Sequence, residues 1–378
     1  MERSLTPPAA NTAISYRGFK IDGKIQLDTY FIGNDGALYV AWVIGPGTWN
    51  RPVRISKPNI APPGANIAVG GRGVIALDLY PGETGGTDFL PYTSQVNLFF
   101  IGNDGALYVA WAIGLGAWNE PTPITQPNIA PPGAILATAY QTSRQLDVFF
   151  IGNNGALHVV WANTSGFGID GWNGPVGITP TNIAPPGGGV ATAYQTSQQL
   201  DVFFIGNNGA LHVSWVIGGG NWLRPVGITP ENIAPPGGRL ATAYQTSRQL
   251  DVFFIGNNGA LHVSWVIGGD KWQGPVSITP ENIAPPGGGV VTAHQTTQQL
   301  VVLFVGNNSI LHVSWVIGGD KWQGPVGISQ QNIAPPGAPL TSAYQTDTQL
   351  DIFVTGHERW VFWTIGTGNW QGPFGLPN

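Results

Sequence analysis

The sequence predicts an all-β fold in which seven repeated units each form a four-stranded antiparallel sheet, the architecture of a seven-bladed β-propeller. Three observations carry this prediction. A pair of tryptophans returns at intervals of about fifty residues, each unit divides into four short strand signals, and a proline stands in the last of them. Helical periodicity appears nowhere along the chain, so the expected fold class is all-β.

The tryptophan pairs define the repeat. Successive first tryptophans are 69, 50, 54, 50, 50 and 48 residues apart, at Trp42, Trp111, Trp161, Trp215, Trp265, Trp315 and Trp363. The second members of the pairs are Trp49, Trp118, Trp172, Trp222, Trp272, Trp322 and Trp370. We therefore divide residues 1–378, as one domain, into units of approximately 5–56, 57–125, 126–179, 180–229, 230–279, 280–329 and 330–378. The chain starts and ends near unit boundaries, so we expect its ends to meet in a closed ring.

The fourth unit illustrates the strand signals. After a Pro/Gly connector, residues 189–196 (GVATAYQT) are rich in β-branched and aromatic residues, and residues 200–206 (LDVFFIG) are apolar on both faces. Asn208 and Gly209 predict a hairpin with a type I′ turn, in which both central residues have positive φ. The third strand is expected at residues 211–218 and the fourth at residues 222–229.

A proline follows the second tryptophan by three residues in every unit, at Pro52, Pro121, Pro175, Pro225, Pro275, Pro325 and Pro373. Proline cannot donate a ladder hydrogen bond and is confined to sheet edges, strand starts and bulges. The fourth strand is therefore expected at an edge. Arg51, Glu120 and Arg224 replace the glycine before this proline in three units, where we expect them to vary local specificity.

Two units depart from the pattern. The second is longer by about nineteen residues within the Gly-rich segment 70–89. A tolerated surface insertion is the favoured interpretation, ahead of a lid or an oligomer contact. In the seventh unit, residues 355–363 replace the hairpin phrase and are two residues shorter, so we expect this unit to lack the hairpin.

The composition excludes several classes of protein. Charged residues make up 9% of the chain, against about 25% in average proteins, and the net charge is -5 without a basic stripe, so no nucleic-acid partner is expected. Cysteine is absent, and no apolar run is long enough to span a membrane. Residues 1–12 lack the apolar region of a secretory signal, which predicts cytoplasmic synthesis and leaves retention or release outside the cell open. The low charge favours self-association as a homo-oligomer.

No catalytic or metal-binding constellation stands out. A glycosidase needs two carboxylates about 5–9.5 Å apart, and the non-repeated acidic residues show no pattern that would bring two together. Five aspartates recur at the start of the second strand, where we expect them to hydrogen-bond the sheet, namely Asp28, Asp147, Asp201, Asp251 and Asp351. The histidines are spread over several units. We therefore predict no enzymatic activity, no metal and no cofactor.

Aromatic rings beside neutral hydrogen-bonding groups recur instead. The residues three before each first tryptophan are Tyr39, Tyr108, His158, His212, His262, His312 and Trp360. Those late in the first strand, each followed by Gln-Thr, are Tyr140, Tyr194, Tyr244, His294 and Tyr344. Sugars offer C–H patches to aromatic faces and hydroxyls to polar groups, so this set predicts carbohydrate binding. We expect the first tryptophans in the core and divide the second equally between core and ligand contact.

The phrases GNNGALHVSW, WQGPVGI and NIAPPG resemble those of the seven-bladed β-propeller lectins of Photorhabdus bacteria, and the resemblance covers essentially the whole chain. It implies several clefts between neighbouring blades that bind L-fucose and related or O-methylated sugars without a catalytic cofactor. It also implies a role in interactions with insect or nematode hosts and, for some members, oligomers.

The resemblance places the candidate sites chiefly between units three to six. The residues that it implies are Trp172, Trp222, Trp272 and Trp322 with His158, His212, His262 and His312, beside Tyr140, Tyr194 and Tyr244. The expected partners are fucosylated, galactose-type or O-methylated glycans. Two alternatives stay open: a propeller glycosidase, and a protein-binding propeller scaffold. The exact sugar and the number of working sites are left undetermined.

Overall fold

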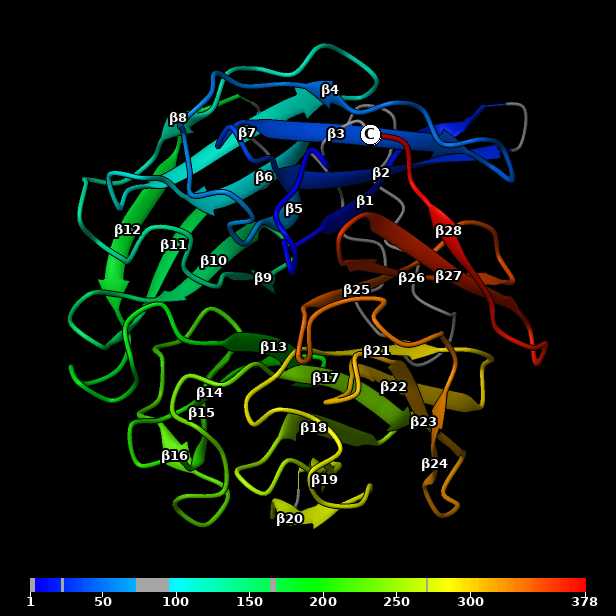
Figure 1. The fold of residues 1–378 in the computed structure, drawn as a ribbon. Helices are drawn as coiled ribbons and strands as arrows, with labels where there is room; N and C mark the ends of the chain where they lie inside the picture. Colours follow the sequence, from blue (N-terminus) through cyan, green and yellow to red (C-terminus); the bar gives the residue numbers. More distant parts are fainter. Residues whose placement is uncertain (1–3, 22–23, 73–94, 164–167, 270) are drawn as a thin grey trace.

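A computed structural model describes residues 4–21, 24–72, 95–163, 168–269 and 271–378. These residues form seven four-stranded antiparallel sheets arranged in a ring, which confirms the predicted seven-bladed β-propeller (Figure 1). Each sheet, or blade, is formed by four consecutive strands of the chain.

The strands of blades one to four have the following bounds: β1 (Ala13–Ile21), β2 (Lys24–Ile32), β3 (Leu38–Ile44), β4 (Val53–Arg54), β5 (Ala68–Arg72), β6 (Gln95–Ile101), β7 (Leu107–Ile113), β8 (Thr122–Pro123), β9 (Ala137–Thr142), β10 (Gln145–Ile151), β11 (Leu157–Asn163), β12 (Trp172–Gly177), β13 (Val190–Thr196), β14 (Gln199–Ile205), β15 (Leu211–Ile217) and β16 (Val226–Gly227). Those of blades five to seven are β17 (Ala241–Thr246), β18 (Gln249–Ile255), β19 (Leu261–Ile267), β20 (Gln273–Ser277), β21 (Val290–His294), β22 (Gln299–Val305), β23 (Leu311–Ile317), β24 (Gln323–Gly327), β25 (Leu340–Tyr344), β26 (Gln349–Thr355), β27 (Arg359–Ile365) and β28 (Gln371–Gly375).

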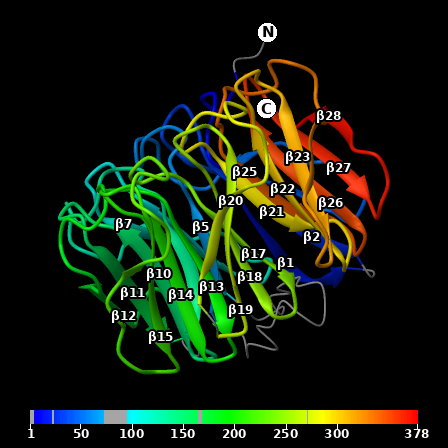
Figure 2. The same ribbon diagram turned by 90° about the horizontal axis from the view of Figure 1, so that it is seen from below.

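The first strand of each blade lies at the centre of the ring and the fourth at its periphery (Figure 1). Neighbouring first strands contact one another around the axis, and β25 of the last blade lies beside β1 of the first. The amide of Ala9 also donates to the carbonyl oxygen of Thr355 at 3.0 Å. No strand is exchanged between these two blades in the described chain, so side-chain packing and such hydrogen bonds close the ring. Figure 2 shows the blades standing side by side from another direction.

The second strands form the core because they are apolar on both faces. In β14, Leu200, Val202 and Phe204 pack against the third blade, whereas Phe203 and Ile205 pack against the fifth. All five side chains are almost completely buried. Full burial of an aliphatic or aromatic side chain contributes about 1.5–3 kcal/mol relative to exposure, so each interface is a hydrophobic core in its own right.

The Asn-Gly hairpin forms, but its turn differs from the predicted type I′. Gly209 has φ 72°, whereas Asn208 is not among the residues with positive φ. The Gly209 amide donates to Gly206 O, and the Gly206 amide donates to Ala210 O, both at 2.9 Å. This is the pattern of a type I turn followed by a left-handed bulge residue. The Asn208 side chain supports the turn because its Oδ1 accepts from the Ala210 amide at 3.1 Å.

The seventh blade keeps a hairpin, contrary to the sequence expectation. Strands β26 and β27 remain paired as far as Thr355 and Arg359, and the Gly356 amide donates to Glu358 O at 2.8 Å. A three-residue loop replaces the five-residue loop of the other blades. Of the long insertion predicted within residues 70–89, residues 70–72 end β5, and the rest lie outside the described residues.

The length of the fourth strand depends on the type of residue that precedes its proline. Glycine occupies this position in blades three, five, six and seven, with φ of 95°, 84°, 89° and 120°, and the strand there has five or six residues. Arg51, Glu120 and Arg224 replace it in the other three blades, whose fourth strands have two residues. Side chains with a Cβ disfavour positive φ, which explains the shortening.

Candidate functional site

The two ends of each blade differ in what covers them. At one end, the hairpin between the second and third strands is bound by the connectors between blades: the Asn207 amide donates to Ile183 O, and the Asn232 amide to Asn208 O, both at 2.9 Å. We call this the connector end. The opposite end, which carries the turns between strands one and two and between strands three and four, is called the rim.

The second tryptophan of each blade packs on the preceding blade, near the rim. The Trp222 ring meets Phe149 edge-to-face, with ring centroids 5.3 Å apart, and Trp172, Trp272 and Trp322 pack in the same way on the corresponding phenylalanines. Their side chains are half-buried. One side of each ring is therefore anchored between blades while another part stays accessible.

The first tryptophans share these interfaces, where they pack against the hydrophobic cores between the blades. Trp161 of the third blade and Trp222 of the fourth pack against one cluster, which we call interface 3/4 after the two blades. Interface 5/6 likewise contains Trp265 and Trp322. All the first tryptophans are half-buried. Each of these interfaces thus presents two indole rings, one from each blade.

A chain of polar side chains lies beside the rings. In interface 5/6, Gln249 Nε2 donates to Asp251 Oδ1 at 2.9 Å and to Gln245 Oε1 at 3.1 Å. Gln245 Nε2 in turn crosses to the next blade and donates to Gly318 O at 2.9 Å. Gln141 makes the same crossing to Gly218 O in interface 3/4, at 3.2 Å. The recurring Gln of the Gln-Thr pair therefore joins adjacent blades at the rim.

The aspartates at the base of this chain are fully buried. Asp147, Asp201, Asp251 and Asp351 each accept from one glutamine, and Oδ2 of each has no hydrogen-bond partner among the described residues. Burial raises the pKa of each carboxyl to about 7, and the hydrogen bond from the glutamine opposes this rise. Asn97 and Val301 occupy the same place in the second and sixth blades, so the position does not require a charge.

Interface 1/2 is different because Arg17 stands where blades three to seven have this glutamine. Its Nε donates to Gly114 O at 2.9 Å and its Nη2 to Gly116 O at 2.5 Å. The guanidinium lies over the ring of Trp118, 4.8 Å from its centroid, and 3.8 Å from Asp28. The pKa of Asp28 is raised only to about 6, because burial is opposed by hydrogen bonds and by the positive charge of Arg17. The protein's own cation thus covers the second tryptophan of this interface.

The predicted histidines lie at the connector end. His158, His212, His262 and His312 stack on phenylalanines of the same blade, and each Nε2 lies 3.0–3.1 Å from an asparagine Oδ1 four residues earlier. Burial lowers the pKa of all four. In the first two blades, Tyr39 and Tyr108 instead donate to Asp35 and Asp104. The paired change from Asn/His to Asp/Tyr is a sequence signal for this contact.

The structure separates these histidines from the tryptophans. In the third blade, Trp172 pairs with Ala162, four residues along β11 from His158. At about 3.3 Å per residue this is a separation of about 13 Å along the strand. Both residues face the second blade, but at opposite ends of the interface.

The predicted tyrosines lie on the inner strands, near the axis. The hydroxyl of Tyr194 donates to Tyr140 O and accepts from the Tyr140 amide at 2.8 Å, and Tyr140 binds both backbone groups of Gly71 in the same way. Tyr344 makes this double contact with His294, and Tyr16 accepts from the Tyr344 amide at 2.7 Å. These hydroxyls satisfy backbone groups at the inner edges of neighbouring blades and so join the blades to one another.

The chemistry available at the interfaces is that of binding. Each of interfaces 3/4, 4/5 and 5/6 holds one buried aspartate from the recurring position, and these lie in different blades, so they do not form the pair of accessible carboxylates that glycoside hydrolysis uses. Among the described residues, no group of three or more acidic or histidine side chains could hold a metal ion. The part of the chain that the structure describes also contains no helix long and apolar enough to cross a membrane.

A propeller that repeats paired, partly exposed indole rings beside amide groups belongs, by fold and by site, to the class of carbohydrate-binding propellers. The chain is 35% identical to the lectin BP39L from Burkholderia pseudomallei over 99% of both chains, with a TM-score of 0.86. It belongs to this family of β-propeller lectins, which confirms the resemblance drawn from the repeated phrases. Lectins bind carbohydrates without converting them, so the protein is a lectin and not an enzyme.

More distant lectins share the fold alone. A variant of Aleuria aurantia lectin, in complex with α-methyl-L-fucoside, is 15% identical and matches 89% of this chain and 98% of its own with a TM-score of 0.53. AofleA from Arthrobotrys oligospora is 15% identical over 86% of this chain and 96% of its own, with a TM-score of 0.53. Aleuria aurantia lectin is six-bladed, so the likeness lies in the blades and not in the size of the ring. No protein-family model and no curated protein matches the sequence.

Proposed function

We propose that this lectin binds L-fucose, galactose-type or O-methylated glycans at the rim of interfaces 2/3 to 5/6, against Trp172, Trp222, Trp272 and Trp322. The observation that carries the proposal is the pairing of each of these rings with the first tryptophan of the preceding blade, as in interface 3/4. A sugar C–H face lies on an indole ring, and the neighbouring amides and backbone carbonyl groups are partners for its hydroxyls. Fucose is the first ligand to test, because related folds have been solved with α-methyl-L-fucoside.

The other predicted residues support the sites from a distance. The histidines hold the hairpins at the connector end, Tyr140 and Tyr194 hold the inner strands together near the axis, and Tyr244 lies at the equivalent position of the fifth blade. Both sets fix how neighbouring blades approach each other, and this spacing sets the distance between the two indole rings. In this proposal they position the tryptophans, and the tryptophans make the contact with the sugar.

Repetition explains how shallow sites could give useful binding. A single site with a dissociation constant of about 1 mM contributes about 4 kcal/mol. Several such sites facing one glycosylated surface strengthen binding by about 10²–10⁴-fold through effective concentration. A host cell surface is the setting in which we propose that this multivalency acts.

A glycan array, with competition by free fucose and free galactose, tests the class of ligand. Retention on fucosylated, galactosylated or O-methylated glycans, released by the free sugar, is the expected result. A partner whose binding survives excess free sugar would instead support a protein-binding scaffold. Absence of retention on every glycan would refute the proposal.

The double variant Trp222→Ala with Trp272→Ala tests the site. We expect it to lose two binding sites per chain by calorimetric titration and to agglutinate erythrocytes at least tenfold less well. Trp118→Ala is the matched control, because Trp118 is the equivalent half-buried ring but is covered by Arg17. It should leave the number of sites unchanged. If the double variant, shown to be folded by thermal unfolding, agglutinates normally, the tryptophans are not the contact residues.

A further inference from the structure

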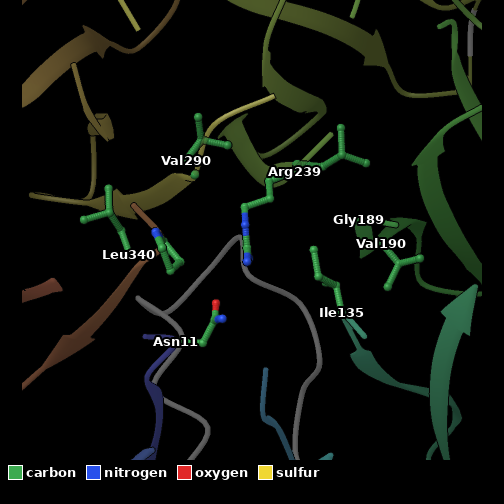
Figure 3. Close-up of a pocket in the computed structure, with 10 residues that line it drawn as sticks. Asn11, Ile135, Gly189, Val190, Arg239, Val290 and Leu340 are labelled. Atoms are coloured by element: carbon green, nitrogen blue, oxygen red, sulfur yellow. The ribbon is translucent and has the colours of Figure 1, made fainter. Parts of the chain in front are cut away.

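The residue one or two positions before the first strand of each blade differs in type from blade to blade. The seven equivalent residues are Asn11, Asn66, Ile135, Gly189, Arg239, Gly289 and Pro339. Six of them line a cavity of about 140 Å³ on the axis, at the connector end (Figure 3). Arg239 is the one charged residue among the described residues of this lining, and its side chain extends toward the centre of the cavity.

Arg239 has almost no partner for its charge. A guanidinium offers five N–H donors, and the structure gives this one a single contact, from Nη1 to Asn66 Oδ1 at 3.3 Å. Among the described residues, no acidic side chain lines the cavity and no ion pair includes Arg239. Burial lowers the pKa of Arg239 to about 10, which reflects the cost of holding a cation there.

The N–H donors of the cavity wall around Arg239 are already engaged in hydrogen bonds within the protein. The amides of Gly189 and Gly289 donate to carbonyl groups of the next blade at 2.9 Å, and Asn66 Nδ2 donates to Gly133 O at 2.8 Å. A Cβ atom on Gly189 or Gly289 would collide with the neighbouring backbone, so the wall is closely packed on both sides of Arg239. The guanidinium is therefore the main free donor that faces the cavity.

We propose that this axial cavity binds a small inorganic anion, a halide or an oxyanion such as phosphate, through the guanidinium of Arg239. Arg239 is half-buried, a charge partly removed from water is costly unless it is paired, and a bound anion supplies the missing charge. Guanidinium groups also match oxyanions in geometry, with two parallel N–H donors. The site lies at the axis, away from the tryptophans at the rim, and does not depend on sugar binding.

Crystals of the full chain soaked in bromide test the site directly. We expect an anomalous difference peak within hydrogen-bond distance of the Arg239 guanidinium. In solution, phosphate at constant ionic strength should raise the melting temperature by about 3 °C when its concentration is 100 times its dissociation constant. Arg239→Gln should abolish this shift, whereas Arg239→Lys should retain part of it.

Arg248→Gln is the matched control, because Arg248 lies in the same blade and is exposed. It should show the full shift with phosphate. The proposal is overturned if bromide gives no peak at Arg239, or if the shift with phosphate persists in folded Arg239→Gln. If Arg239→Gln does not fold, two other results test the proposal. It is overturned if bromide gives no peak at Arg239, or if phosphate does not raise the melting temperature of folded Arg239→Lys.

Discussion

Interfaces 1/2 and 5/6 have the same backbone plan and differ in what covers the second tryptophan. In interface 5/6, Gln245 bridges the blades through Gly318 O, and Trp322 packs edge-to-face on Phe253. In interface 1/2, the longer Arg17 makes the bridge and lies over Trp118. One residue on the inner strand therefore decides whether the ring at the rim is covered by the protein itself.

The two interfaces also differ in the groups that surround the buried carboxyl. Asp28 has Arg17 nearby and accepts hydrogen bonds from Gln26 and Tyr30. Asp251 accepts one hydrogen bond from Gln249 and has no cation beside it among the described residues. The pKa values of about 6 and about 7 reflect this difference. The same substitution should therefore have opposite effects at the two positions.

The largest effect is expected for Asp28→Asn. This change leaves Arg17 buried without its carboxylate, and breaking a buried pair in this way costs about 3 kcal/mol. Denaturant unfolding at pH 7 should show a lower free energy of unfolding for the variant. An unchanged free energy of unfolding would mean that the two carbonyl groups bound by Arg17 are sufficient to stabilise its buried charge.

Asp251→Asn should act in the opposite direction above pH 7. The folded-state pKa of about 7 lies above the unfolded value of about 3.9, so the folded protein binds more protons between these pH values. The wild-type free energy of unfolding therefore falls as pH rises through this window, and the loss is complete above it. The asparagine variant carries no such charge and should be the more stable form at pH 8, by about 2 kcal/mol.

Thermal unfolding of both proteins at pH 5 and pH 8 measures this effect. The difference between the two proteins should be smaller at pH 5, because only the lower part of the window between the two pKa values has been crossed there. A variant that is less stable than the wild type at both pH values would show that the ionised Asp251 has a favourable partner. The second blade carries an asparagine, Asn97, at the equivalent position, so the blade fold accepts this residue there.

Arg17→Gln should have the most specific effect on binding, although it also breaks the buried pair with Asp28 and should lower the free energy of unfolding. Glutamine is too short to cover Trp118, so interface 1/2 would come to resemble interface 5/6. Calorimetric titration with the sugar retained on the array should then give one more site per chain. An unchanged number of sites would mean that Arg17 is not what closes this interface.

The fold followed from the sequence because its signals are local. The strand signals and the prolines of the fourth strand recur from unit to unit, an Asn-Gly or Asp-Gly hairpin recurs in units one to five, and each copy predicts the same sheet. The turn type was wrong because the Asn-Gly pair is compatible with more than one hairpin, and Asn208 stabilises the type I form through the Ala210 amide. The hairpin of the seventh blade was missed because its shorter loop lacks the repeated phrase, although its strands stay paired.

The candidate site could be predicted from the sequence only in part. Sequence reasoning selected the second tryptophans, which the structure places at the interfaces, and it also selected the histidines, which lie about 13 Å along the strand from them. It placed the first tryptophans in the core; they do pack on the cores between blades, but strand alternation gives the face of a residue and not its depth, so their partial exposure was not predicted. The role of the tyrosine hydroxyls depends on the next blade and could not be seen within one repeat.

The sequence by itself determined the number of blades, the order of strands and the set of recurring rings, because these depend on spacing within a repeat. Only the tertiary structure decided which rings of adjacent blades meet, which of them Arg17 covers, and that Arg239 reaches the axis without a counter-charge. These outcomes depend on contacts between residues about fifty or more positions apart, where a side chain of one blade fills space that belongs to another.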